Sequence, residues 1–285
     1  MIYFCADDYG VSVVSNSRIE NCINNGALNK VSVLPNGETS ELGRCLTEGK
    51  ATFGLHINLV EGPSLSAPEE ISLLVSEDGN FRYSFIGLFL QSFFGNRKKL
   101  EEQIYKEIQK QIKFWKASFG EENEVFLDSH QHVHMIPLVF KVLMRAVRDE
   151  KLNVGYLRIP AEPVLPYIMT PSLYFSYSPV GIVKQWLLKI LALVNAREIR
   201  CSQIPDAYFM GVLFSGKMSE KVVNKLLPKY MKLAEKNNKN IEIGFHPGYI
   251  ENGEEMFFKG TKNFGKFYFS PWRKVEYNAL LNLKF

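Results

Sequence analysis

Short apolar runs alternate with charged segments of helical period along most of the chain. The apolar runs predict seven strands, at residues 2–6, 30–34, 52–58, 124–129, 155–159, 207–215 and 241–245. The segments between them predict helices at residues 15–25, 41–48, 98–118, 137–149, 220–236 and 270–285. Regular alternation of this kind favours a parallel sheet covered by helices.

Polar residues that could take part in catalysis or metal binding gather where these predicted strands end. Active sites lie at the carboxyl ends of the strands both in α/β barrels and in open α/β sheets. The coincidence predicts a barrel-like α/β fold, one domain over residues 1–285 with insertions at about 61–95 and 161–205. A flat doubly wound sheet is the alternative. It normally has a glycine-rich phosphate turn after the first strand, and Ala6-Asp7-Asp8-Tyr9-Gly10 is not one.

Composition narrows the function classes only a little. The 285 residues are 46% apolar and 22% charged, which excludes disorder and fibrous repeats. A net charge of +4 on this chain gives no reason to expect nucleic acid or an anionic membrane as a partner. The four cysteines have no paired spacing, which is typical of reduced thiols. We therefore expect a cytoplasmic protein.

No apolar segment reaches the ~18 residues needed to span a bilayer. Residues 182–194 are apolar but include Lys184 and Lys189, so a buried or lid helix is the better interpretation. The first ten residues include two acids and no basic region, unlike a signal peptide.

Asp7 and Asp8 follow directly on the first apolar run. Two adjacent acids are poor strand residues, and a helix cap or turn would explain them without any function. If the backbone turns at the strand end, both carboxylates can instead approach one site with different roles. One would bind a metal ion and the other would act as a general base.

A histidine cluster follows the fourth predicted strand, in Asp128-Ser129-His130-Gln131-His132-Val133-His134. In a continuing strand, alternate residues share a face, so the carboxylate and the three imidazoles would lie together. A polar surface strand is the other interpretation. Burying these groups without partners is prohibitive, whereas imidazole is a common metal ligand. We predict that one histidine binds metal and that the others contact substrate or orient neighbours, with Asp128 as an acceptor.

Three further residues stand at the ends of predicted strands, His56, Arg158 and His246, and Asp206 stands directly before one. His56 alone would be an ordinary structural residue, but its position beside the other histidine motifs favours the site. Pro247 and Gly248 force a turn after His246 and expose it at the rim. Arg158 could neutralise one of the paired acids. Asp206 taken alone gives little evidence for a role in the site.

Taken in order, these motifs resemble the YdjC/ChbG carbohydrate deacetylases. The resemblance rests on Ala6-Asp7-Asp8-Tyr9-Gly10, Gly54-Leu55-His56, the 127–134 histidine cluster, Arg158-Ile159-Pro160 and His246-Pro247-Gly248-Tyr249. It covers residues 3 to about 249. It implies an irregular or incomplete TIM-like barrel that binds one divalent metal and removes N-acetyl groups from amino sugars.

The resemblance also implies a role for each matching residue. Asp8, His56 and His130 would be metal ligands, Asp7 the base and His246 the acid. The implied ligand set suits zinc, cobalt or manganese and permits magnesium. Tyr9 could stack on a sugar ring or belong to the core. Gln131 stands where the family often has histidine, but it has the opposite parity to the ligand and should have little effect. The 162–179 segment has no clear counterpart, which leaves the choice of sugar open. The oligomeric state is also left open, with a homo-oligomer as one option.

Two other functions compete with deacetylation. A phosphoesterase would usually need two metals, and Asp7, His132 and His134 could supply the second site. The other is a sugar-binding or regulatory protein without catalysis. Such a protein would need neither Asp7 beside a ligand nor His246 at the rim.

Overall fold

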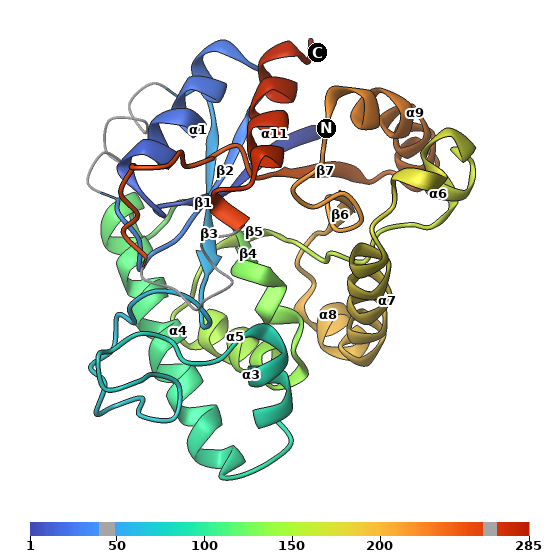
Figure 1. Cartoon of the computed structure of the whole chain (residues 1–285). Coiled ribbons are helices and arrows are strands. Elements are labelled where there is room, and N and C mark those ends of the chain that lie inside the picture. The colour runs from blue at the N-terminus through green and yellow to red at the C-terminus, as the bar shows by residue number, and fades with distance from the viewer. Residues whose placement is uncertain (40–48, 259–266, 285) are drawn as a thin grey trace.

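The computed structural model describes residues 1–39, 49–258 and 267–284. Its centre is a seven-stranded sheet in the order β5-β4-β3-β2-β1-β7-β6, with every neighbouring pair parallel. The strands are β1 (Ile2–Tyr9), β2 (Lys30–Val33), β3 (Thr52–Ile57), β4 (Val125–Ser129), β5 (Val154–Leu157), β6 (Ala207–Met210) and β7 (Asn240–Phe245). Figure 1 shows them at the centre of the molecule with helices around them.

The strand order identifies an open barrel. Sequential strands are neighbours from β1 to β5, and β7 returns to the other side of β1. A doubly wound sheet would instead reverse its strand order in the middle. In the described part of the chain, β5 and β6 are edges of the sheet, and one backbone hydrogen bond from Leu157 to the carbonyl of Pro205 links them. The prediction of a TIM-like barrel is thus confirmed in its open, incomplete form.

Amphipathic helices cover the outside of the sheet. They are α1 (Val13–Asn25), α4 (Arg97–Phe119), α5 (Pro137–Asp149), α9 (Glu220–Asn237) and α11 (Pro271–Asn282). Serine hydroxyls accept a backbone N–H at the start of α1, α9 and α11, as expected for good helix caps. Leu100, Ile104 and Ile108 form part of the buried stripe of α4. These helices therefore follow the sequence pattern closely.

The two predicted insertions add shorter elements at the carboxyl ends of the strands. Residues 61–95 form a long loop that ends in α3 (Phe85–Gln91). Residues 161–205 contain α6 (Leu165–Ile168), η2 (Pro171–Ser176), α7 (Pro179–Val194) and α8 (Ala196–Ser202). No single helix among the described residues is long and apolar enough to cross a membrane; α7 and α8 pass that test only as a pair, bent by 63°. The helix expected at 41–48 lies outside the described residues.

Two strands differ from their predicted lengths. β1 continues through Asp7 and Asp8, which the hydrophobic pattern excluded. β6 ends at Met210 instead of residue 215, because the next three backbone N–H groups donate to the buried carboxylate of Glu162. The side chain of Glu162 thus accepts from backbone N–H groups that would bond to a neighbouring strand if β6 were longer.

Candidate metal centre

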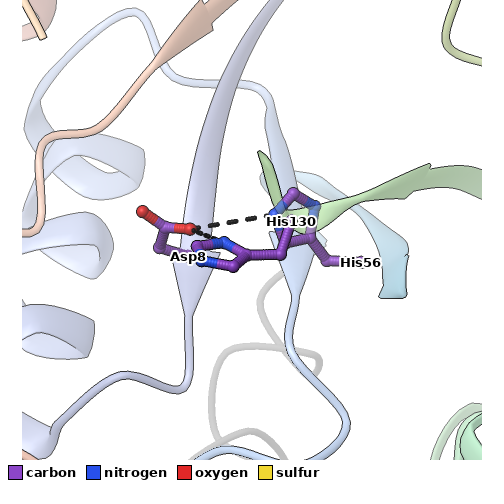
Figure 2. A group of neighbouring side chains, drawn as sticks. All are labelled: Asp8, His56 and His130. Atoms are coloured by element: carbon purple, nitrogen blue, oxygen red, sulfur yellow. Dashed lines mark hydrogen bonds and ion pairs between the residues drawn. The ribbon is translucent and has the colours of Figure 1, made fainter. Parts of the chain in front are cut away.

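Asp8, His56 and His130 meet at the carboxyl end of the sheet (Figure 2). Asp8 lies on β1, His56 on β3, and His130 begins η1 (His130–Met135), directly after β4. Asp8 has a positive φ of 69°, and the pairing of β1 with β2 shifts register between Ala6 and Tyr9. The expected turn in the backbone therefore occurs at Asp8 itself, and both acids are buried beside the site.

Each of the three side chains has one polar atom held by another residue. Arg273 donates to Oδ2 of Asp8 at 2.7 Å, and His56 donates from Nδ1 to Asp128 at 2.7 Å. His130 contacts Glu61 through Nε2 at 2.7 Å. The remaining polar atom of each side chain then faces the other two side chains. Oδ1 of Asp8 lies 2.8 Å from Nδ1 of His130 and 3.7 Å from Nε2 of His56.

This arrangement fits a divalent metal ion. One carboxylate oxygen and two imidazole nitrogens lie within 4.8 Å of one another and are buried. Such a mixed donor set is typical of zinc and other first-row metals. Carboxylates on the remote nitrogens of metal-binding histidines fix the tautomer and ring orientation, as Asp128 and Glu61 would do here.

Neighbouring charges fix the protonation of this cluster. Burial alone would raise the pKa of Asp8, but His130 and Arg273 hold it well below its usual range. Burial would lower the pKa of His130, yet the carboxylates of Glu61 and Asp8 raise it to about 10. A proton and a metal cation would therefore compete for the same imidazole nitrogen.

Asp7 lies beside the cluster and is paired with Arg158. The guanidinium donates to both carboxylate oxygens, at 2.7 and 2.9 Å. Burial would raise the pKa of Asp7, but Arg158 and then His56 outweigh it and lower the value. The expectation that Arg158 would neutralise one of the paired acids agrees with this geometry, and Asp7 remains ionised.

Two other groups of ligand-type residues overlap this one in the described part of the chain, Asp7-His56-Asp128 and Cys5-Asp128-Glu242. Arg158 already supplies a cation to both groups. It pairs with Asp128 at 2.8 Å and with Glu242 at 2.7 Å, and it donates to the thiol of Cys5. Asp8-His56-His130 is the group that this guanidinium leaves available.

His246 is placed at the edge of the site by α11. Its backbone N–H donates to Glu276 at 2.5 Å, and its ring Nδ1 lies 3.4 Å from the same carboxylate. The ring also makes an edge contact with Phe267. The side chain remains partly exposed and lines the cavity, in agreement with the expected rim position.

The site opens into a cavity of about 570 Å³. Its polar wall includes Asp7, Asp8, His56, Glu61, His130 and His246. Apolar side chains of α3 and α7 also line it, among them Phe85, Val183 and Leu187. Pockets of this size, with a few polar groups in a mainly apolar lining, are typical small-molecule sites.

The strand-face argument for the histidine cluster is wrong beyond residue 130. β4 ends at Ser129, and Gln131 and His132 have positive φ angles of 51° and 59° inside η1. His134 is consequently turned away, with its ring bonded to Ser129 and to the carbonyl of Arg158. Burial lowers its pKa to about 4. His132 still lines the cavity, against the edge of Phe209.

Two other expected site residues lie apart from the cluster. Tyr9 is buried and its hydroxyl donates to Glu20, so its ring belongs to the core. Asp206 precedes β6, at the amino end of that strand, and pairs with Lys239 at 2.6 Å. The metal cluster lies at the carboxyl ends of the strands, so Asp206 lies at the opposite end of the sheet from it.

Sequence reasoning missed three residues that organise the site: Glu61, Arg273 and Glu276. Glu61 follows the end of β3 closely, and an acid at that position was an available signal. Arg273 and Glu276 come from α11, far along the chain, and reach the site only through the fold. Nothing local in that helix distinguishes them from surface charges.

Comparisons with known proteins agree with this geometry. The family model described as YdjC-like protein matches residues 1–285. A carbohydrate deacetylase of Xenopus laevis is 28% identical and spans 87% of this chain and 81% of its own. A chitooligosaccharide deacetylase of Citrobacter koseri is 24% identical, with the same two coverages of 87% and 81%.

A solved structure also has this fold. It is an Enterococcus faecalis V583 protein provisionally named for cellobiose-phosphate cleavage, with a TM-score of 0.68 and 18% sequence identity. The likeness covers 98% of this chain and 90% of that one. Since the family model matches the chain from end to end, this protein belongs to the YdjC family.

Proposed function

We propose that this protein removes the N-acetyl group from an amino sugar with the help of one divalent metal ion. One observation carries the proposal: a fitting set of metal ligands, an ionised carboxylate and a rim imidazole share one cavity. Curated family members named carbohydrate deacetylase and chitooligosaccharide deacetylase support the acetamide as the bond that is cleaved.

Asp8, His56 and His130 would hold the metal ion. Such an ion supplies a Lewis acid that polarises a carbonyl group and acidifies water. Asp128, Glu61 and Arg273 each hold one atom of a ligand, so that the other atom is directed inward before anything binds. Zinc, magnesium, manganese and cobalt all remain candidates for the ion.

Asp7 would take the proton from the attacking water. The bidentate contact from Arg158 fixes its carboxylate and keeps it ionised, which leaves its oxygens able to accept a proton. His246 would carry the opposite role and give a proton to the departing amine. Glu276 lies 3.4 Å from Nδ1 of His246 and accepts from its backbone N–H, which would position the ring at the cavity wall for that role.

The phosphoesterase alternative gains no support from the geometry. Its second metal site would need Asp7, His132 and His134, but His134 is engaged by Ser129 and Arg158. Asp7 pairs with the Arg158 guanidinium, whose positive charge opposes a second cation at that carboxylate. The candidate ligands among the described residues therefore favour one metal over two.

Substitution of His246 by alanine tests the proposal. An amide needs a proton on nitrogen before it breaks, whereas an ester alkoxide leaves more easily. We expect His246→Ala to hydrolyse N-acetylglucosamine about 10²–10⁴-fold more slowly and to lose much less activity on an acetyl ester. Equal losses on both substrates would assign His246 to substrate positioning, and no loss would remove it from the site.

A further inference from the structure

Two helices from the insertions flank the mouth of the cavity. Phe85 and Ile86 of α3 line one part of it, and Val180, Val183 and Leu187 of α7 line another. In Figure 1, α3 and α7 both lie below the sheet, on the side toward which the arrow of β3 points. What these helices present outward therefore decides what can approach the metal centre.

Both helices present large apolar side chains to solvent. We call this surface the apolar face. On the α3 side it consists of Ile86, Leu90, Phe93 and Phe94. On α7 it consists of Val183, Trp186, Ile190, Leu193 and Val194. Phe94 is 67% exposed and Leu193 is 76% exposed, which is unusual for such residues on a single chain.

The apolar face is continuous with the cavity. Successive residues of a helix are about 100° apart, so α7 uses only the side of Gly181, Gln185 and Leu188 to pack on the body. Val183 belongs to both surfaces, because it lines the cavity and is 67% exposed. A surface helix of a soluble domain would have polar residues on its outward side. Here the apolar lining continues out of the cavity mouth.

The two segments that carry the apolar face have charges of a single sign. Residues 79–100 and 163–197 contain no aspartate or glutamate, although the whole chain has 30 acids against 34 bases. Arg97, Lys98 and Lys99 follow the exposed Phe93-Phe94 pair, and all three are exposed. On α7, the ammonium of Lys189 lies 5.9 Å from the Trp186 ring. Basic residues beside tryptophan, phenylalanine and leucine are typical of helices that lie in the interface of an anionic bilayer.

A long oligosaccharide fits this surface poorly. Sugar hydroxyls need hydrogen-bond partners, and aliphatic side chains such as Ile190, Leu193 and Val194 provide none. An acyl or isoprenoid chain needs only apolar contact, which these residues supply. The cavity would then hold a polar sugar beside its polar wall, while the chain attached to that sugar lies along α3 and α7.

We propose that the apolar face docks on an anionic lipid bilayer and that the substrate is an N-acetylated amino sugar carried on a lipid. The substrate part of this proposal rests on the proposed deacetylase function, whereas the docking part does not. It departs from the expectation of no membrane partner. That expectation came from net charge and the length of apolar runs, and neither quantity reveals which side chains the fold leaves exposed.

Docking is tested by flotation of the purified chain with phosphatidylcholine vesicles that contain or lack phosphatidylglycerol. We expect binding to the anionic vesicles, and a loss of at least about tenfold in the double variant Phe94→Ser/Trp186→Ser. Neither residue lines the cavity. Met231→Ser is the matched control, since Met231 is 46% exposed on α9, away from this face, and should bind as the unaltered chain does.

Several results would overturn the docking proposal. These are no binding to anionic vesicles, equal binding to both vesicle types, or unchanged binding in the double variant. Light scattering could provide a further contradicting result. If the unaltered chain is a dimer and the double variant a monomer, the apolar face is covered by a second copy and not by lipid.

The lipid-carried substrate is tested with two glycosides of N-acetylglucosamine. The dodecyl glycoside in anionic vesicles should show a kcat/KM at least about tenfold higher than the soluble methyl glycoside, and the double variant should abolish only that difference. Equal values for both glycosides would contradict a lipid substrate. Absence of acetate release from either glycoside would instead contradict the deacetylase proposal, while flotation would still decide docking.

Discussion

At the scale of single residues, the metal centre depends on side chains that bind the ligand atoms facing away from the metal site. Asp128 fixes one nitrogen of His56 and Glu61 fixes one nitrogen of His130. Both carboxylates are themselves held: Asp128 by Ser32 and Arg158, and Glu61 by Gln131. The direction of each imidazole is consequently set by the fold before any ion arrives.

Replacement of Glu61 by glutamine should weaken metal binding without removing a ligand. The variant loses the negative charge that His130 Nε2 faces at 2.7 Å, so the ring is held less firmly. We expect metal affinity to fall about 10–100-fold in a calorimetric titration. Glu69→Gln, in the same loop but exposed, is the control and should titrate as the unaltered chain does. Unchanged affinity in Glu61→Gln would show that Glu61 does not orient His130.

Replacement of Asp7 by asparagine should separate the base from the ligands. Asp7 contacts Arg158 and lies outside the Asp8-His56-His130 group. The variant should therefore retain stoichiometric metal and lose turnover by about 10²–10⁴-fold. Elemental analysis and acetate release measure the two quantities on one sample. Metal lost together with activity would make Asp7 a ligand.

The sequence was informative about residues whose position depends only on a strand end. Asp8, His56 and His130 each follow a short apolar run, and the parallel sheet brings such ends together. The pattern failed at His134, because two left-handed residues end the alternation after His130, whereas His132 still lines the cavity. The role of Arg273 could not be predicted from the sequence, since its contact with Asp8 joins residues 265 positions apart.

At the scale of elements, the end of β1 is shaped by a close approach of two loops. The segment after β2 crosses directly over Gly10, and a Cβ on Gly37 would lie 2.4 Å from the Gly10 carbonyl oxygen. Only glycine fits at Gly37 without moving backbone. This contact supports the turn that contains Asp8, two residues before Gly10.

Gly37→Ala should therefore destabilise the fold. The expected loss is about 1–3 kcal/mol in the free energy of unfolding, as for other overpacked sites, measured by urea titration. Gly87→Ala is the control. Gly87 lies inside α3 and an added Cβ there would meet only side-chain atoms, the nearest at 3.4 Å, so alanine should be neutral or stabilising. Equal stability of the two variants would mean that the loop can shift away from Gly10.

Element lengths were predictable where local pattern decides them and not elsewhere. The buried stripe of α4 and the proline that starts α5 correspond to the predicted helices. β6 was predicted too long, because its ending depends on Glu162, a residue from a distant loop. No window of sequence around residue 211 contains that information.

At the scale of the whole molecule, buried ions join opposite parts of the barrel beneath the metal centre. Glu242 on β7 accepts from Lys30 on β2 and from Arg158 after β5, each at 2.7 Å. All three side chains are fully buried. Arg158 then continues the network to Asp7 and Asp128, so the charges that hold the site also connect the sheet across its width.

This network predicts how stability changes in acid. Burial would raise the pKa of Glu242, but Arg158 and Lys30 lower it from 4.5 to about 2. A lowered pKa means that the ionised group stabilises the fold above about pH 4.5 and that this contribution is lost as pH falls toward 2. Between these values the unaltered chain should lose about 3 kcal/mol more than Glu242→Gln. Parallel pH dependences in urea titrations would contradict the coupling.

We propose that Asp8, His56 and His130 hold one metal ion on which sugar deacetylation depends. Acetate release from the methyl and dodecyl glycosides of N-acetylglucosamine is measured together with the metal content of the same samples. We expect about one divalent ion per chain, loss of acetate release after chelation and its return with added metal. His56→Ala should lack both the ion and the activity. Two ions per chain, or acetate release that survives chelation and the His56→Ala change, would contradict it.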